Sequence, residues 1–125
     1  MPTVKTWKLT REWSPVAVGT GETTPLFNVA PGVRVVSASY RVLIASAAAS
    51  VVTVSLGDGT DVAGFIAAFD PETATVAAGG GTFLANSGGK LYGAADTIDV
   101  VYAVTTAGVT NPKVQFTVTF VREWP

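Results

Sequence analysis

The sequence predicts an all-β protein, an antiparallel β-sandwich or jelly-roll-like fold with at most one short helix. Apolar and polar residues alternate with a period of two through most of its 125 residues, the pattern of strands that bury one face. Gly, Pro and Asn separate about eight such segments, and a single segment has helical spacing. Many short strands with so little helix favour two packed antiparallel sheets.

A single β-sandwich domain is expected to span residues 1–125, because this length buries a core without disulfides. Its terminal strands are expected at residues 4–13 and 113–124. Alternation places four residues of the first strand on one face: Trp7, Leu9, Arg11 and Trp13. In the last strand the corresponding face holds Val114, Phe116, Val118, Phe120, Arg122 and Trp124.

Between the termini, strands are expected at residues 26–30, 34–45, 51–57 and 96–106. The turn pair Pro31-Gly32 closes the first of these. We expect residues 34–45 and 51–57 to be neighbouring antiparallel strands, and residues 96–106 to form a hairpin with the last strand. The residues expected on the core-facing sides are Val36, Ala38, Tyr40, Val42 and Ile44, then Val52, Val54 and Leu56, then Ile98, Val100, Tyr102 and Val104.

The segment with helical spacing covers residues 60–71, with apolar residues at positions 62, 65, 66 and 69. Asp61 is a candidate N-cap and Asp70-Pro71 a stop signal, so the segment is either one short helix or an irregular crossover. Gly64 disfavours a longer helix. Residues 72–93 are rich in glycine and are expected to form brief strands at TFLA and KLY on a loop-rich edge.

Composition limits the possible functions. Charged residues are 14% of the chain and apolar residues 48%, so little charge is available to coat an isolated monomer, and oligomerisation or lattice contact is expected. A net charge of -1 gives no basic stripe for nucleic acid. The uncharged stretch at residues 43–56 is too short and too rich in Ser and Thr for a membrane span, and the N-terminus lacks the pattern of a signal peptide.

The chain has no His and no Cys, which removes the common nucleophile systems and most zinc and iron sites, so we expect neither an enzyme nor a cofactor or metal site. GDGTD at residues 57–61 resembles part of a calcium loop but lacks its later ligands, so Asp58-Gly59 is interpreted as a strand-ending turn. Gly79-Gly80-Gly81 is interpreted as a flexible loop or tight turn, because no phosphate-loop context surrounds it.

Arg-Glu-Trp occurs twice, at residues 11–13 and 122–124, in the same strand phase. This repetition predicts that the terminal strands lie close together, by direct pairing or across a subunit boundary, unless three residues recur by chance. The tryptophans are candidates for the core edge or for an interface. The candidate interface residues are Trp7, Arg11, Glu12, Trp13, Arg122, Glu123 and Trp124.

Four motifs occur in order: LGDGTD, VAGFIAAFD, a stretch containing GKLYGAADTIDVVY, and KVQFTVTFVR. Over residues 51–122 this order resembles small virion proteins of tailed bacteriophages, particularly head decoration or cement proteins that stabilise the capsid. The resemblance implies a β-rich structural protein on the outer capsid surface of the virion. Its implied partners are its own copies, with a trimer favoured, and the major capsid protein lattice.

Two alternatives remain open at this stage. Related-looking sequences also occur in phage tails and head fibres, so a tail or fibre location is one of them. The other is a carbohydrate-binding β-sandwich module on a fibre or a cell surface, because the chain has three Trp and three Tyr and aromatic rings stack on sugars.

Overall fold

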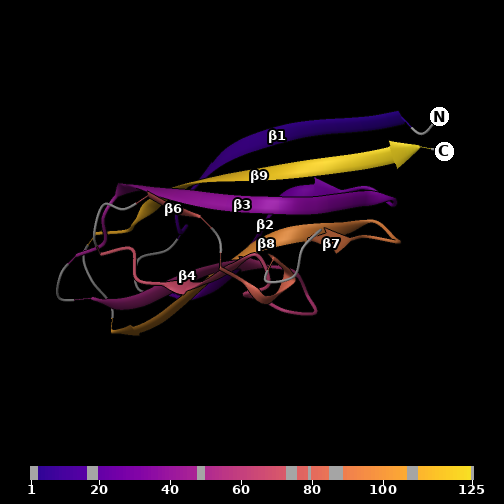
Figure 1. Ribbon diagram of the computed structural model, residues 1–125. Helices are drawn as coiled ribbons and strands as arrows, with labels where there is room; N and C mark the ends of the chain where they lie inside the picture. Colours follow the sequence, from indigo (N-terminus) through magenta and orange to yellow (C-terminus); the bar gives the residue numbers. More distant parts are fainter. Residues whose placement is uncertain are drawn as a thin grey trace.

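The computed structural model describes residues 3–16, 20–47, 50–72, 76–78, 80–84, 89–106 and 110–124. Two antiparallel sheets pack face to face in a sandwich (Figure 1). The predicted fold class, an all-β antiparallel sandwich, is therefore confirmed. The strands are β1 (Thr3–Trp13), β2 (Glu22–Val29), β3 (Val33–Ile44), β4 (Val51–Gly57), β5 (Ile66–Phe69), β6 (Val76–Ala78), β7 (Lys90–Leu91), β8 (Asp96–Thr106) and β9 (Lys113–Trp124).

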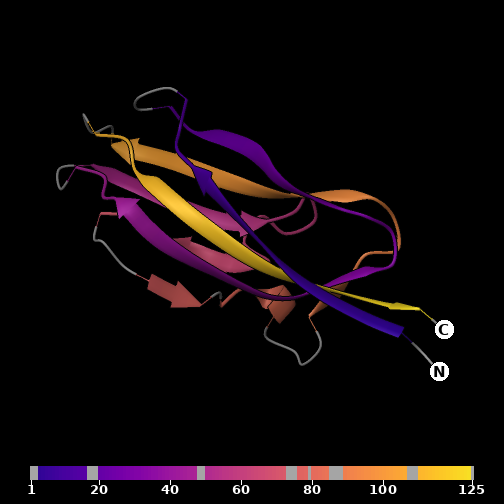
Figure 2. The ribbon, with the colours of Figure 1, turned by 90° about the horizontal axis from the view of Figure 1, so that it is seen from above.

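One sheet has the order β1-β9-β3-β6, with β7 also paired to β3, and the other has the order β2-β8-β4-β5. Most consecutive strands therefore belong to different sheets. Strands β4 and β5 are an exception, because they follow each other in the sequence and pair within the four-stranded sheet. Strands β1 and β9 are paired, with Thr3 at the start of β1 opposite Trp124 at the end of β9, and Figure 2 shows these two strand ends close together.

Two predicted strand pairs are wrong. β8 pairs with β2 and β4 rather than with β9, and β3 pairs with β9, β6 and β7 rather than with β4. In both cases the connection crosses from one sheet to the other. A strand with one apolar face can bury that face whether the next strand pairs with it in a hairpin or lies in the opposite sheet. A six-residue link is long enough to span the ~10 Å between packed sheets.

The core lies between the sheets and is built from the predicted faces of β4, β8 and β9. Val54, Leu56, Ile98, Val100 and Phe116 are fully buried. In β3 the predicted face is correct at Ala38 and Val42 but wrong at both ends. Ile44 at the end is 49% exposed, and near the start Val33 and Val35 are buried instead of Val36. A register shift between Val35 and Ser37 inserts one residue and exchanges the two faces.

Of the two alternatives for residues 60–71, a short helix or an irregular segment, the structure has the second. Turns occupy residues 59–65, and strand β5 follows them. Phe65 and Ile66 are both buried, one in the turn and one in the strand, and this produces the spacing that resembles a helix. The helical segment among the described residues is a single 3-10 turn at Thr82–Leu84, where a strand was expected. No helix in the described part is long and apolar enough to cross a bilayer.

Glycine is required where the segment before β5 meets the segment after β6. A Cβ at Gly64 would lie 2.1 Å from the ring of Phe83, and a Cβ at Gly81 would lie 2.3 Å from the carbonyl oxygen of Gly64. The amide of Phe83 donates a hydrogen bond to that same carbonyl at 2.7 Å. The last glycine of the Gly79-Gly80-Gly81 run therefore serves close backbone packing.

Candidate interaction surface

Strands β1 and β9 pair along eleven positions, from Thr3 opposite Trp124 to Trp13 opposite Val114, without a register shift. The terminal strands thus lie side by side by direct pairing, one of the two arrangements that the repeated phrase predicts. Figure 1 shows β1 on the outer side of β9, at the edge of the five-stranded sheet.

The two Arg-Glu-Trp phrases nevertheless do not meet. In an antiparallel pair, a phrase at the end of the first strand faces the start of its partner. Arg11 is opposite Phe116, whereas Arg122 is opposite Lys5. Lys5 and Arg11 are six residues apart on β1, which corresponds to about 20 Å at ~3.4 Å per residue. The phrases therefore occupy opposite ends of one strand pair.

The tryptophans of β1 close the edge of the core. Trp13 is buried, 4% exposed, and its ring meets Tyr102 edge-on at 5.4 Å between centroids. Trp7 is half-buried and stacks on Phe120 at 5.5 Å. Lys5 lies over the Trp7 ring, with its Nζ 5.7 Å from the ring centroid. The structure thus assigns both rings to packing between β1 and the sandwich.

The charged members of the candidate interface lie at the surface. Arg11 is exposed, and its guanidinium carbon is 5.9 Å from the centroid of the Phe27 ring. Glu12 forms an ion pair with Lys113 on β9 at 3.1 Å. Arg122 is half-buried, and exposed Glu123 lines a surface hollow of about 290 Å³. The side chain of Trp124 lies outside the described residues.

We expect Glu12→Gln to change the free energy of unfolding by less than about 0.5 kcal/mol. Both partners of its ion pair are well exposed, 50% for Glu12 and 40% for Lys113, and exposed pairs contribute little. Urea denaturation at low and high salt measures this effect. A loss of more than 1 kcal/mol that salt abolishes would contradict it.

The outer face of the five-stranded sheet carries rows of hydroxyl groups. Cross-strand register aligns Thr10, Thr117 and Ser39 in one row, and Thr119 with Ser37 in the next. The hydroxyls of Thr10 and Thr117 are hydrogen-bonded at 3.0 Å. We call these five residues the hydroxyl face. The same register places Lys8 opposite Thr119, and Glu12 and Arg41 opposite Gln115, so charged side chains lie beside the hydroxyl rows on this face.

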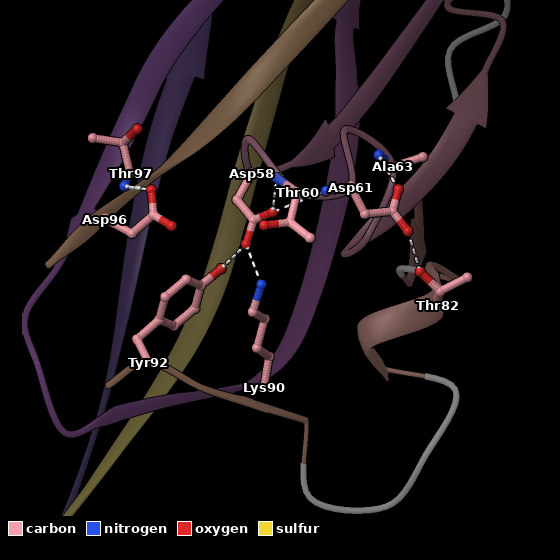
Figure 3. A network of polar contacts seen from close by, with 9 residues as sticks. All are labelled: Asp58, Thr60, Asp61, Ala63, Thr82, Lys90, Tyr92, Asp96 and Thr97. Carbon is pink, nitrogen blue, oxygen red and sulfur yellow. Dashed lines mark hydrogen bonds and ion pairs between the residues drawn. The ribbon is translucent and has the colours of Figure 1, made fainter. Parts of the chain in front are cut away.

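A second cluster of polar residues, which sequence reasoning missed, surrounds Asp58 (Figure 3). The Asp58 side chain is fully buried. Its Oδ1 accepts hydrogen bonds from the backbone N–H groups of Thr60 and Asp61 at 2.9 and 3.1 Å. Its Oδ2 accepts from Lys90 Nζ at 2.5 Å and from Tyr92 Oη at 2.7 Å. The cluster joins the end of β4 to β7 and its following residue on the opposite sheet.

Burial alone would raise the pKa of Asp58, but hydrogen bonds from Lys90, Tyr92 and the two backbone amides outweigh it and hold the pKa below its usual 3.8. Burial also raises the pKa of Tyr92, and the neighbouring Asp58 carboxylate raises it further. At neutral pH the carboxylate is therefore ionised and the phenol is protonated. Lys90 also lies 3.9 Å from the centroid of the Phe83 ring, which holds its charge over an aromatic face.

Asp61 stabilises the turn that follows Asp58. Its Oδ2 accepts a hydrogen bond from Thr82 Oγ1 at 2.5 Å and its Oδ1 accepts one from the amide of Ala63 at 3.0 Å. The bond from Thr82, followed by that from Ala63, lowers the pKa of Asp61. Both aspartates of GDGTD thus accept hydrogen bonds from the protein itself. The turn interpretation of Asp58-Gly59 fits this geometry, because Oδ1 of Asp58 accepts from the backbone N–H groups of the two residues after Gly59.

The fold places the chain in a structural class found in phage capsids. A chain of the acidic stable capsid structure of Helicobacter pylori bacteriophage KHP30 superposes with a TM-score of 0.68 and 15% identity, covering 100% of this chain and 99% of that one. A chain of the capsid asymmetric unit of cyanophage Pam1 superposes with a TM-score of 0.63 and 15% identity, covering 97% and 86%. No protein-family model and no curated protein matches the sequence. At this level of identity, the likeness to the two chains is one of fold.

Proposed function

We propose that this chain is a structural protein of a bacteriophage capsid and resides in the virion. The observation that carries the proposal is the full-length likeness of its fold to chains of two phage capsid structures. The composition supports the same role, because a chain without His or Cys lacks the residues that most enzymes use for acid-base and nucleophilic chemistry.

Within that role, we assign the chain to decoration and stabilisation of the outer shell as an oligomer, with a trimer favoured. Only 14% of its residues are charged, and the hydroxyl face presents short uncharged side chains to a neighbour. Among the described residues, five large apolar side chains are also more than half exposed to water: Val4, Val16, Val51, Val62 and Leu91. Surfaces of this kind are stabilised when a partner covers them.

The proposed interface follows strands β1 and β9. It comprises Trp7, Arg11 and Glu12 on β1 and Arg122, Glu123 and Trp124 on β9, with Trp13 supporting β1 from the core. The carbohydrate-binding alternative has less support. Apart from Trp124, whose side chain is not described, the Trp and Tyr rings are buried or stacked within the fold, as Tyr40 is on Phe69 at 3.7 Å between centroids.

Capsid shells that lack this protein test the proposal. The added chain should bind them saturably and raise the temperature at which they release their DNA, and sedimentation should show an oligomer at high micromolar concentration. A strictly monomeric protein that leaves shell binding and shell stability unchanged would contradict the proposed role. A glycan array is the matched control, since a saturable response to a sugar would favour a binding module instead.

A further inference from the structure

The sheet edges of this protein are protected unequally. At the far edge of the five-stranded sheet, β6 and β7 have three and two residues, and in the four-stranded sheet the edge strand β5 has four. The other edge strand, β2, contains Pro25 and a register shift beside it. Short length, proline and bulges are the devices by which sheets prevent pairing with other chains.

Strand β1 has none of these three devices. It runs for eleven residues, contains no proline and keeps an unbroken register with β9. Its outer side therefore offers a long row of backbone donors and acceptors to another strand. Three exposed cations lie along it, Lys5, Lys8 and Arg11. Among the described residues, none of these three cations forms an ion pair with a carboxylate.

A second copy of β1 is a poor partner for this edge. Antiparallel pairing centred on Lys8 places Lys8 opposite Lys8 and Lys5 opposite Arg11, and parallel pairing in register places each cation opposite itself. Like charges directly opposite each other destabilise a strand pair. Charge thus disfavours the two registers that pair the full length of β1. Shorter antiparallel registers can place Glu12 opposite Lys8, but a strand of opposite charge is needed to neutralise all three cations.

Carboxylates within this chain do not supply such a strand. The cations are three positions apart, and pairs of aspartates with that spacing occur at residues 58 and 61 and at residues 96 and 99. The first pair lies in the buried cluster. In the second pair, Asp96 accepts a hydrogen bond from the amide of Thr97 and Asp99 accepts one from its hydroxyl, both at 2.7 Å, within strand β8.

We propose that the open edge of β1 binds an extended acidic segment of another protein, which adds to the five-stranded sheet as a further antiparallel strand. Carboxylates at every third position of that segment lie opposite Arg11, Lys8 and Lys5. A spacing of three residues alternates between the two faces of a strand, so the carboxylates follow the same alternation as the cations. The half-buried ring of Trp7, between Lys5 and Leu9 on its face, packs against an apolar residue of the added strand.

The partner that fits is a segment of the coat lattice, and that part of the inference rests on the proposed capsid function. The edge itself is a property of the chain and can be tested without a capsid. The probe is a nine-residue peptide of Val and Thr with Glu at positions 2, 5 and 8, and the matched control peptide carries Lys at the same positions. Amide hydrogen exchange of the full chain, followed by NMR, reports which strand each peptide contacts.

The Glu peptide is expected to slow exchange at least tenfold at alternate amides of β1, those that do not bond to β9, and to leave β2 and β5 unchanged. The Lys peptide should have no effect. Lys8→Glu should weaken binding of the Glu peptide about five- to tenfold, since it replaces attraction by repulsion at the centre of the pair. Arg41→Glu is the matched control, because Arg41 is exposed on β3 of the same sheet, two strands from the edge.

Absence of slowing in β1, or equal slowing by both peptides, overturns the proposal. Slowing that appears without peptide as the protein concentration rises identifies a second copy as the occupant and also overturns it. Binding of the Lys8→Glu variant to capsid shells separates this inference from the proposed function. Shells that bind the variant as tightly as the original chain exclude the edge as the coat contact, whereas shells that bind neither protein contradict the capsid role and leave the peptide result standing.

Discussion

Asp58→Ala is expected to lower the free energy of unfolding by about 3 kcal/mol, the largest effect of any polar substitution in this chain. Removing one partner of a buried ion pair leaves the other charge without compensation, which typically costs 3–5 kcal/mol, roughly the scale of a lost core residue. The lower end applies because Lys90 keeps 24% of its side-chain exposure and can reach water. The phenol of Tyr92, which is 4% exposed, also loses its acceptor.

Two further variants separate charge from shape in this cluster. Asp58→Asn keeps the volume and one acceptor for the backbone amides, so it should cost less than Asp58→Ala. Lys90→Met removes the cation but keeps most of the apolar stem over the Phe83 ring. It should leave the Asp58 carboxylate without its ion-pair partner and lower the free energy of unfolding substantially. Urea denaturation measures all three. A cost below 1 kcal/mol for Asp58→Ala would show that the cluster contributes little to the stability of the sandwich.

The pH dependence provides a second readout of the same cluster. The folded-state pKa of Asp58 lies below the usual 3.8, so its contribution is complete above 3.8 and is lost as pH falls through the lower folded value. The pKa of Tyr92 is raised above its usual 10.0, so the folded state favours the neutral phenol and this contribution is lost as pH rises above 10.0. In Asp58→Ala the acid-side loss from this carboxylate should disappear.

The strands and their buried faces are predictable because alternation is a local property of the sequence. The pairing of those strands is not local. The same alternation in β8 and β9 is compatible with a hairpin and with two strands facing across the core, and the chain adopts the second. The phase error in β3 has a similar origin. Val35 and Val36 are both apolar, so the sequence does not show which of them faces the core until pairing with β9 reveals the bulge at Val36.

The candidate site also has a part that is predictable from local sequence and a part that depends on distant residues. The turn at Asp58-Gly59 is visible in the sequence, but its burial depends on Lys90 and Tyr92, more than thirty positions away, and no local pattern connects them. The repeated Arg-Glu-Trp phrase correctly indicates that the terminal strands are neighbours. It does not indicate that antiparallel pairing places the two phrases at opposite ends of the strand pair, where they have different neighbours.

The aromatic column at Phe120 connects the edge strand to the rest of the sandwich. Phe120 is 1% exposed and lies on the central strand of its sheet, opposite Trp7 on β1 and Val35 on β3. Its ring contacts both layers, with centroids 5.5 Å from Trp7 and 6.2 Å from Phe27 on β2. One side chain therefore supports the inner face of β1 and closes the gap between the two sheets at that point.

Phe120→Ala is expected to lower the free energy of unfolding by about 3–5 kcal/mol, because it leaves a cavity in the core and removes the stacking partner of Trp7. Beyond this global loss, the amides of β1 should exchange faster relative to those of β4 and β8, since the inner face of β1 loses its main support. Thr117→Ala is the matched control on the same strand. It faces outward and should cost only about 0.5–1 kcal/mol through its bond to Thr10. Uniform acceleration of exchange in all strands would show instead that β1 is held by its backbone pairing with β9 alone.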